Sequence, residues 1–315
     1  MVIKRYATGD ATEWDAFVEC SKNGTFLFKR AYMDYHADRF LDHSLLYYDN
    51  KKHLVAIMPG NEVGNKYYSH QGLTYGGLVL STKTKMADVM NIFDITIEYL
   101  RSQGFSEWHY KQIPSIYHKY PSEEDEYALW RHGAQVSVCN ISTTISLNSD
   151  FKVSYEERRK RGAKKATAQG YVVRETDDIA SFWPIVEDNL MTKYGAHPIH
   201  SLNEIVLLKS LFSKNIRCFV AEKDGAIEGG IIAYQTDTTL HHQYPHATIK
   251  GKQDGVIDLL TTTIIEKYCA TSKIRYYDFG TSNEDAGRYL NENLIAQKEG
   301  FGGRGIAYKT YTIRL

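Results

Sequence analysis

Residues 154–174 read SYEERRKRGAKKATAQGYVVR and carry six Lys and Arg residues within eight positions, 158–165. Glu156 and Glu157 precede these cations, and Gly170 follows them. Acidic residues at the start of a helix and basic residues toward its end both complement the helix dipole. The pattern therefore predicts a basic helix over 156–168 and a strand from Tyr171 onward. A solvated surface helix would satisfy the charge pattern alone, but this helix lies at mid-chain between two halves that resemble each other.

The two halves follow the same order of predicted elements. Each has a strand, a polar turn and a strand, then an amphipathic helix, a short strand, a helical stretch, a glycine and a long closing strand. The paired segments are 44–59 and 218–234, 85–102 and 254–270, 106–111 and 275–279, and 144–147 and 312–315. Trp108 and Tyr276 are separated by the same 168 positions as the ends of the closing strands. Matches in order along the chain predict a tandem repeat of one α/β unit.

The order of elements predicts an α/β fold (α+β) with a mixed sheet and helices on both faces. It is similar to the order in acyltransferases of the GNAT fold, so we expect a tandem duplication of that fold. We expect residues 1–150 to form the first unit, 151–170 the connecting helix, and 171–315 the second unit with the donor site.

Composition restricts the class of protein. The 38 acidic and 38 basic residues argue against a nucleic-acid coat or a polybasic membrane anchor. No apolar run approaches the ~20 residues of a membrane span, and the four cysteines are scattered. We expect a cytoplasmic protein with ordinary globular units.

Two motifs stand near the C-terminus. Asp278-Phe279-Gly280 follows a predicted strand, and Lys298-Glu299-Gly300-Phe301-Gly302 precedes the last strand. With the duplication and the basic mid-chain helix, these motifs resemble the FemAB-like family of double-GNAT acyltransferases. The resemblance covers nearly the whole chain and is strongest to the branch found in bacterial cell-surface polysaccharide clusters.

Three residues are catalytic candidates, and the resemblance implies the role of the first. Lys298 matches the lysine that the family places near the reacting carbonyl, where a fixed charge would stabilise an oxyanion or bind a substrate phosphate. Asp278, at the end of a central strand, would orient or deprotonate the amine, or else cap the following loop. His242 is a candidate base because imidazole titrates near neutrality.

Donor binding is predicted at residues 250–256. Lys250, Gly251, Lys252 and Gly255 lie at the start of the predicted helix at about 254–270, where the GNAT fold places the pyrophosphate of coenzyme A. The spacing departs from the family's pattern, and a plain turn with a helix cap at Asp254 explains the segment nearly as well. We expect acyl-CoA as the donor, whereas neutral net charge disfavours tRNA.

The remaining candidates concern the acceptor. Arg158, Arg161 and Lys165 of the basic helix would bind its phosphates, with Tyr194 and Tyr244 beside it; His242 and Tyr244 are expected to share one face of a strand. His241, His242 and His246 do not converge as metal ligands would, so no metal is expected.

The sequence thus predicts an acyltransferase that moves an acyl group, acetyl by expectation, from acyl-CoA to an amine. The acceptor would be a nucleotide- or lipid-linked amino sugar or a related cell-envelope precursor. Two alternatives stay open at this point: aminoacyl transfer from charged tRNA, and a ligand-binding protein without catalysis.

Overall fold

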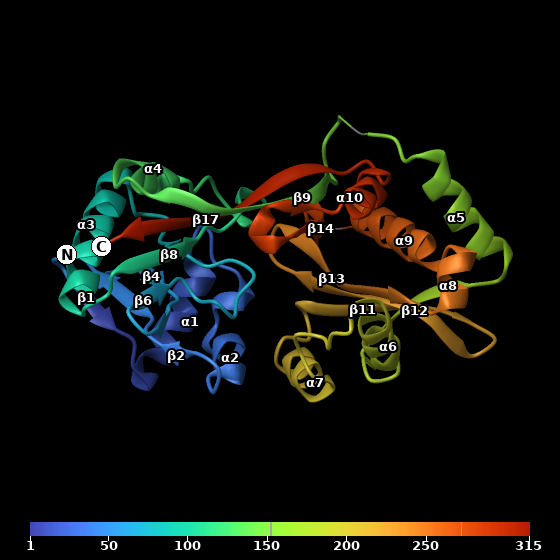
Figure 1. Ribbon diagram of the computed structural model, residues 1–315, viewed down its shortest axis with the longest axis horizontal. Coiled ribbons are helices and arrows are strands. Elements are labelled where there is room, and N and C mark those ends of the chain that lie inside the picture. The colour runs from blue at the N-terminus through green and yellow to red at the C-terminus, as the bar shows by residue number, and fades with distance from the viewer. Residues whose placement is uncertain (152, 272) are drawn as a thin grey trace. The chain divides into compact units, whose positions relative to one another are not determined.

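The computed structural model describes residues 1–151, 153–271 and 273–315, which form two compact units (Figure 1). The first unit comprises 1–140, 285–289 and 307–315, and the second comprises 141–284 and 290–306. The long strands β9 (Gln135–Ser146) and β17 (Arg304–Arg314) each have residues in both units. These bounds differ from the expected ones, 1–150 and 171–315. The reason is that β9 begins in the first unit and ends in the second, whereas β17 begins in the second and ends in the first.

The elements of the first unit appear in the predicted order. Its strands are β1 (Val2–Arg5), β2 (Leu41–Asp42), β3 (Leu45–Tyr48), β4 (Leu54–Met58), β5 (Asn61–Val63), β6 (Lys66–Tyr68), β7 (Val79–Leu80) and β8 (Glu107–Lys111). Its helices are α1 (Ala11–Cys20), α2 (Arg30–Met33), α3 (Met86–Ser102) and α4 (Glu124–Arg131).

The second unit repeats that order and adds two helices. Its strands are β10 (Val172–Thr176), β11 (Ile216–Lys223), β12 (Ala226–Gln235), β13 (Thr239–Ala247), β14 (Tyr276–Thr281) and the short β15 (Asn283–Glu284). The short β16 (Tyr289–Leu290) has one residue in each unit. The helices of the second unit are α5 (Glu157–Ala168), α6 (Trp183–Tyr194), α7 (Leu202–Leu211), α8 (Ile249–Asp254), α9 (Val256–Thr271) and α10 (Glu292–Glu299). The predicted mixed α/β class and the duplication are confirmed, and α5 is the predicted basic helix.

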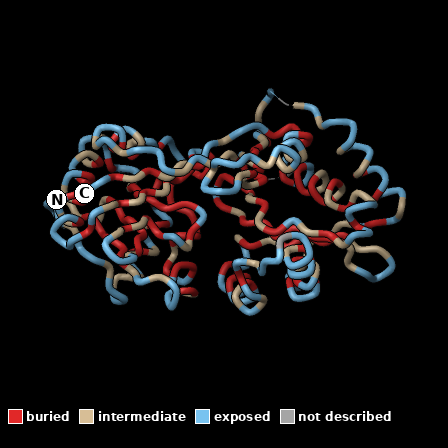
Figure 2. The backbone as a smooth tube through the Cα atoms, viewed as in Figure 1, coloured by how far each residue is buried: buried red, intermediate tan, exposed pale blue. Residues whose placement is uncertain are grey.

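The sheet of the second unit runs in the order β10-β11-β12-β13-β14-β9. β13 and β14 are parallel, and the other neighbours are antiparallel. Helix α9 covers one face of the sheet and α6 and α7 the other (Figure 1). The buried residues of Figure 2 lie along these strands and the inner side of α9, where Phe219, Leu260 and Tyr277 belong to one apolar cluster.

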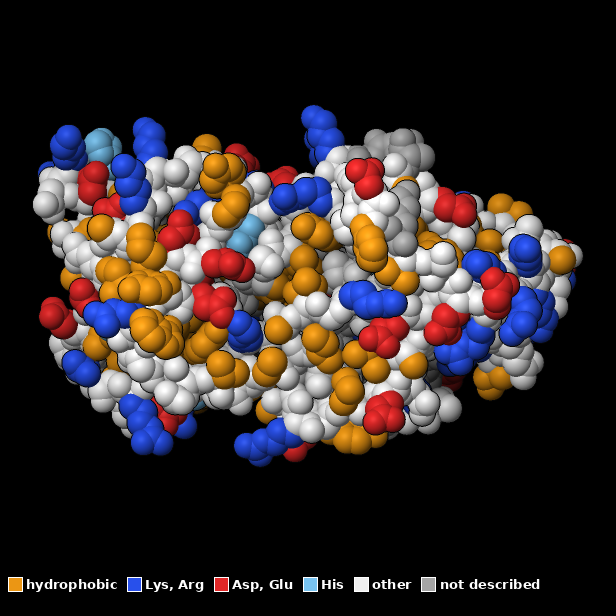
Figure 3. Space-filling model, turned by 90° about the horizontal axis from the view of Figure 1, so that it is seen from above, with side chains coloured by type: hydrophobic (Ala, Val, Ile, Leu, Met, Phe, Trp, Pro, Cys, Tyr) orange, Lys and Arg blue, Asp and Glu red, His pale blue; other side chains and the backbone are white. Residues whose placement is uncertain are grey.

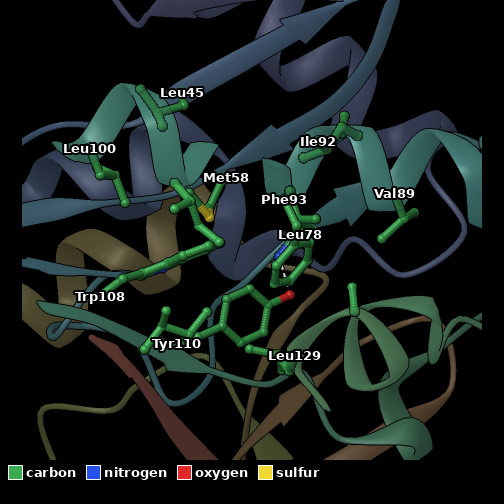
Figure 4. Packing of buried hydrophobic residues seen from close by; sticks show 14 of the residues in the cluster. Leu45, Met58, Leu78, Val89, Ile92, Phe93, Leu100, Trp108, Tyr110 and Leu129 are labelled. Atoms are coloured by element: carbon green, nitrogen blue, oxygen red, sulfur yellow. Dashed lines mark hydrogen bonds between the residues drawn. The ribbon is translucent and has the colours of Figure 1, made fainter. Parts of the chain in front are cut away.

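The first unit departs from the second at the strand that follows the hairpin. β7 is an edge strand beside β4, and β8 pairs instead with β6 of an added hairpin and with β17. The ring of Tyr110 lies beside Leu78 within the core (Figure 4), and its hydroxyl accepts the backbone N–H of Leu78 at 2.8 Å. The same hydroxyl donates to Asp125 at 2.7 Å. A tyrosine of β8 therefore bonds to the segment that leads into β7.

The burial of aromatic residues on β8 and β14 changes one match between the two halves. Trp108 is fully buried on β8, whereas Tyr276 is only half-buried, and Tyr277 is the fully buried residue on β14. Side chains alternate between faces along a strand. The structural equivalent of Trp108 is therefore Tyr277, one position beyond the match expected from the sequence.

Close packing of backbones fixes α5 and α8 against α9. A Cβ atom added at Gly162 of α5 would lie 1.9 Å from Oδ2 of Asp258 on α9, and one added at Gly255 would lie 2.4 Å from the carbonyl oxygen of Gly162. Arg159 also donates to Asp258 at 2.5 Å. These glycines allow the helices to approach. In the described part of the chain, no helix is long and apolar enough to cross a bilayer.

Gly255→Ala should destabilise the protein far more than Gly225→Ala. Both glycines have positive φ, +85° and +80°, so both alanines meet the strain of about 1–2 kcal/mol of a left-handed residue. Only Gly255 has a neighbouring backbone in the way, which should add roughly 1–3 kcal/mol of overpacking. Denaturant unfolding of the two variants measures the difference. Equal losses would contradict the close approach of α5 and α9.

Candidate active site

A cavity of about 550 Å³ lies inside the second unit. Its walls come from α6, β13, α8, α9, β14, α10 and the turn after α10. His242, Lys252, Phe279, Lys298 and Phe301 are among the lining residues. The volume falls within the range of about 300–1,000 Å³ that is usual for small-molecule sites.

The cavity exists because β13 and β14 stop pairing partway along their length. Their parallel pairing begins at Thr239–Tyr276 and ends at His241–Asp278, although β13 continues to Ala247. Beyond this point the two strands no longer share hydrogen bonds. Side chains of β13, α9 and α10 line the space left there.

Asp278 fixes the position at which β13 and β14 separate. It is fully buried and does not line the cavity. Its Oδ1 accepts the hydroxyls of Ser142 and, at 3.0 Å, Thr144 of β9, and its Oδ2 lies 2.8 Å from Nδ1 of His241. Because its oxygens bind three side chains of neighbouring strands, Asp278 holds the sheet in place.

A β-bulge in β13 decides which side chains reach the cavity. His242 pairs with Ala233, but Tyr244 pairs with Ile232, so the register shifts by one residue at Gln243. Cross-strand partners lie on the same face of a sheet, and the bulge therefore places His242 and Tyr244 on opposite faces. The expectation that these two side chains share a face is wrong for this reason. Tyr244 packs on Trp183, with His200 2.6 Å from its hydroxyl.

Lys298 projects from α10 toward the end of β14. Its Nζ donates to the carbonyl oxygens of Gly280 and Thr281, both at 2.8 Å. Gly280 has a φ of +76°, and the pairing of β14 with β9 is irregular between Asp278 and Thr281. An ammonium group has three donors, so one donor is left for a ligand. Burial lowers the pKa of Lys298 to about 8, with Asp278 acting in the opposite direction.

His242 is a neutral hydrogen-bonding group in the wall of the cavity. Burial, together with the charges of His241 and Lys298, lowers its pKa to about 3. Its Nδ1 lies 3.4 Å from the hydroxyl of Tyr277, and its Nε2 has no hydrogen-bond partner among the described residues. His246, also in the wall, has a pKa of about 4 because of burial. Both rings stay uncharged at neutral pH.

The segment expected to hold a pyrophosphate is a helical turn, α8, packed against protein. Thr248 caps it by accepting the N–H of Gly251 at 2.9 Å. A Cβ at Gly251 would lie 2.2 Å from the carbonyl oxygen of Glu228. Lys252 lines the cavity and donates to Asn189, whereas the exposed Lys250 lies 3.7 Å from Glu228. Gly251 and Gly255 thus allow backbones to approach each other, and Lys252 alone of the four faces the cavity.

The cations of α5 fall into two groups. Arg159, Lys160 and Lys165 have acidic partners on α5, α8 or α9. Arg158, Arg161 and Lys164 are exposed and have no salt bridge within the described residues. Positions 158, 161 and 164 follow the three-residue spacing of one helix face. Figure 3 shows basic side chains gathered at the end of the second unit where Figure 1 places α5.

The structure thus brings together three of the predicted residues: Lys298, His242 and Lys252. Arg158, Arg161 and Lys165 lie on α5 and do not line the cavity, and the side chain of Tyr194 lies outside what the structure describes. Sequence reasoning missed the rings of Phe279 and Phe301, although each precedes a glycine in the two C-terminal motifs. No group of three or more His, Cys, Asp or Glu side chains suited to a metal ion occurs among the described residues.

Comparison with known proteins identifies the fold. The family described as "Acetyltransferase (GNAT) domain" matches residues 154–289. The structure of FemX matches with a TM-score of 0.70 at 10% identity, covering 100% of this chain and 98% of that one. The C-terminal domain of a putative lysylphosphatidylglycerol synthetase from Agrobacterium fabrum matches at 0.65, with 11% identity and coverage of 98% and 92%. L-PGS from Bacillus licheniformis matches at 0.62, with 12% identity and coverage of 96% and 91%. No curated protein sequence matches the chain.

Lys298→Met should change how stability depends on pH. The pKa of Lys298 is about 8 when folded, against 10.5 for an ordinary lysine, so the unfolded state binds more protons between these values. Stability of the wild type relative to the variant should therefore rise with pH from about 8 to 10.5, by up to about 3 kcal/mol. Urea unfolding of both proteins between pH 8 and 10.5 measures this difference in stability. Parallel curves would show that Lys298 is not desolvated.

Proposed function

We propose that this chain, an acyltransferase with the double-GNAT fold of the FemAB-like family, transfers an aminoacyl group from an RNA ester to an amine of a cell-envelope precursor. The observation that carries the proposal is the cavity between the separated strands β13 and β14, with a half-buried ammonium and a neutral imidazole in its wall. In the first unit, Tyr110 of β8 is buried in the core and bonded to Leu78 just before β7, which supports the second unit as the reacting one.

Lys298 is suited to polarising the carbonyl group of the donor. Two of its three donors bind Gly280 and Thr281, which fixes the direction of the third. A fixed positive charge in a partly dry site stabilises the negative charge that develops on the carbonyl oxygen as the amine attacks. With a pKa of about 8, Lys298 is mostly protonated at neutral pH.

His242 is suited to receiving a hydrogen bond from the amine. Its low pKa makes it a weak base, so it orients a neutral amine rather than removing a proton from an ammonium ion. The amine nitrogen attacks the ester carbonyl, and the bond between the carbonyl carbon and the ribose oxygen breaks. The amine proton ends on that oxygen, which leaves an amide and a free hydroxyl.

The packing of α8 favours an ester on RNA over a thioester of coenzyme A. A pyrophosphate held on the first turn of α9 would need glycines open to the ligand, but Gly251 and Gly255 are packed against the carbonyls of Glu228 and Gly162. Beside them, Arg158, Arg161 and Lys164 leave a row of exposed charge on α5, which suits the regular phosphates of a nucleic-acid backbone.

The similar structures support the class of acceptor. FemX, L-PGS and the domain of a putative lysylphosphatidylglycerol synthetase share the fold, and the name of the last refers to an aminoacylated membrane lipid. By analogy we infer an acceptor of the cell envelope. Acyl-CoA is the second candidate donor, because Lys252 and Lys193 at the cavity would also suit its phosphates.

Binding measurements with a hydrolysis-resistant aminoacyl-RNA and with acetyl-CoA should separate the two donors. We expect the RNA to bind with an affinity that falls steeply with salt. Replacing Arg158, Arg161 and Lys164 by Ser should reduce the slope of log K against log salt by roughly 2, since each phosphate contact contributes about 0.7–0.9. A control variant replaces Lys51, Lys83 and Arg101 of the first unit, which are also exposed.

Equal effects of the two triple variants would contradict a binding role for α5. Stabilisation by acetyl-CoA without RNA binding would replace the proposed donor by acyl-CoA. If neither ligand binds, the proposed reaction is wrong.

His242→Gln should retain more activity than His242→Leu. Gln still accepts a hydrogen bond, whereas Leu leaves the amine without a partner, a cost of about 1–3 kcal/mol or roughly 5- to 150-fold in kcat/KM. Since the pKa of His242 is about 3, acidification from pH 7 to 5 should not protonate it. Steady-state kinetics of the Gln and Leu variants between pH 5 and 7 checks both expectations, with His246→Gln as the control. Equal inactivity of the Gln and Leu variants would mean that His242 accepts a proton.

A further inference from the structure

A second cavity of about 440 Å³ lies in the same unit, next to the cavity that contains Lys298. Its walls come from the end of β9, the segment that leads into α5, the C-terminal half of α9 and the turn after α10. Leu147, Tyr155, Ile265 and Cys269 are among its lining residues. None of the residues of the reaction discussed above lines this cavity, so its purpose is unassigned.

The two cavities lie along one row of side chains on α9. Ile257 and Thr261 line the first cavity, and Ile265 and Cys269 line the second. These four positions are spaced by four residues, so they follow one another along a single face of the helix. One helix face therefore forms part of the wall of both cavities.

Phe301 separates the two cavities, because it lines both of them. Its side chain is 2% exposed and stacks on Phe279 of the first cavity, with 5.6 Å between ring centroids. On the other side it meets the ring of Tyr155 of the second cavity edge-on at 5.7 Å. The ring of Phe301 thus lies between one aromatic residue of each lining.

The backbone on either side of Phe301 is fixed by glycines. Gly302 has a φ of +86°, and a Cβ there would lie 2.4 Å from the carbonyl oxygen of Val153. Gly300 accepts the N–H of Glu156 at 2.8 Å, which joins this turn to the start of α5. The ring of Phe301 therefore has a defined position, and its size decides whether the cavities connect.

We propose that Phe301 is a specificity-determining residue that limits the size of the transferred group, and that the second cavity is where a larger apolar side chain would extend. The inference rests on the proposed function, because it takes the first cavity to hold the reacting carbonyl. Leu147, Tyr155 and Ile265 make the space behind Phe301 suited to an aliphatic or aromatic chain. The charged residues in its lining, Glu266 and Arg304, are both exposed side chains.

The test compares donors of increasing side-chain size on wild type, Phe301→Leu and Phe301→Ala. Hydrolysable RNA esters of alanine, leucine and 2-aminodecanoic acid serve as donors, and kcat/KM is measured for each. The wild type should favour the smaller groups. In both variants, the ratio of kcat/KM for the 2-aminodecanoate ester to that for the alanine ester should rise at least tenfold. Phe301→Leu is included because it keeps most of the apolar packing.

A second substitution distinguishes the proposed path from a general loosening of the site. Cys269→Phe places a ring in the second cavity and does not alter the first. Added to Phe301→Leu, it should abolish the gain for 2-aminodecanoate and leave the rate with alanine unchanged. Cys269→Phe alone should behave as the wild type with all three donors.

The possible outcomes separate this inference from the proposed function. If all proteins transfer alanine and the size ratio is unchanged in both Phe301 variants, the inference is wrong and the proposed function stands. If the gain survives in the double variant, the longer chain does not enter the second cavity, and the inference is also wrong. If the folded wild type transfers none of the three groups, the proposed function fails first.

Discussion

The separation of β13 from β14 after the His241–Asp278 pair is the constraint on which the candidate site depends. Two adjacent parallel strands would normally continue their ladder, and the cavity would then be closed by backbone hydrogen bonds. Asp278 fixes the last paired position by accepting hydrogen bonds from Ser142 and Thr144 and by binding His241. A buried carboxylate thus sets where the pairing of β13 with β14 stops, and the side chains of the candidate site line the cavity just beyond it.

The two units differ in what lies beside the strand that follows the long helix, β8 in the first unit and β14 in the second. In the first unit β8 pairs with the added hairpin instead of β7, and the buried Tyr110 is hydrogen-bonded to Leu78 and Asp125. In the second unit Lys298 and His242 line the cavity beside β14. One α/β unit can therefore serve as a packed scaffold or as a binding site, depending on the side chain beside the strand that follows the long helix.

Much of the fold could be predicted from the sequence because its elements have strong local signals. The periodic helix at 85–102, the polar turn within 218–234 and the basic helix at 156–168 all lie where the patterns indicated, to within one residue for the helices. The site was harder to predict. No local pattern marks the bulge at Gln243, which sends His242 and Tyr244 to opposite faces. Gly255 lies against the carbonyl oxygen of Gly162, about 90 positions earlier in the chain, and Gly251 lies against that of Glu228. No local pattern shows that these glycines, which resemble a phosphate loop, are packed against backbone.

The central claim is that the cavity of the second unit receives the activated carbonyl beside Lys298. The most direct measurement is a crystal structure of the protein with a 3′-aminoacylamido-adenosine, a stable mimic of the ester end of a charged RNA. The account predicts that the carbonyl oxygen of the mimic lies within hydrogen-bond distance of Nζ of Lys298, with the aminoacyl side chain directed toward Phe301. Binding of the mimic at any place other than this cavity would contradict the account.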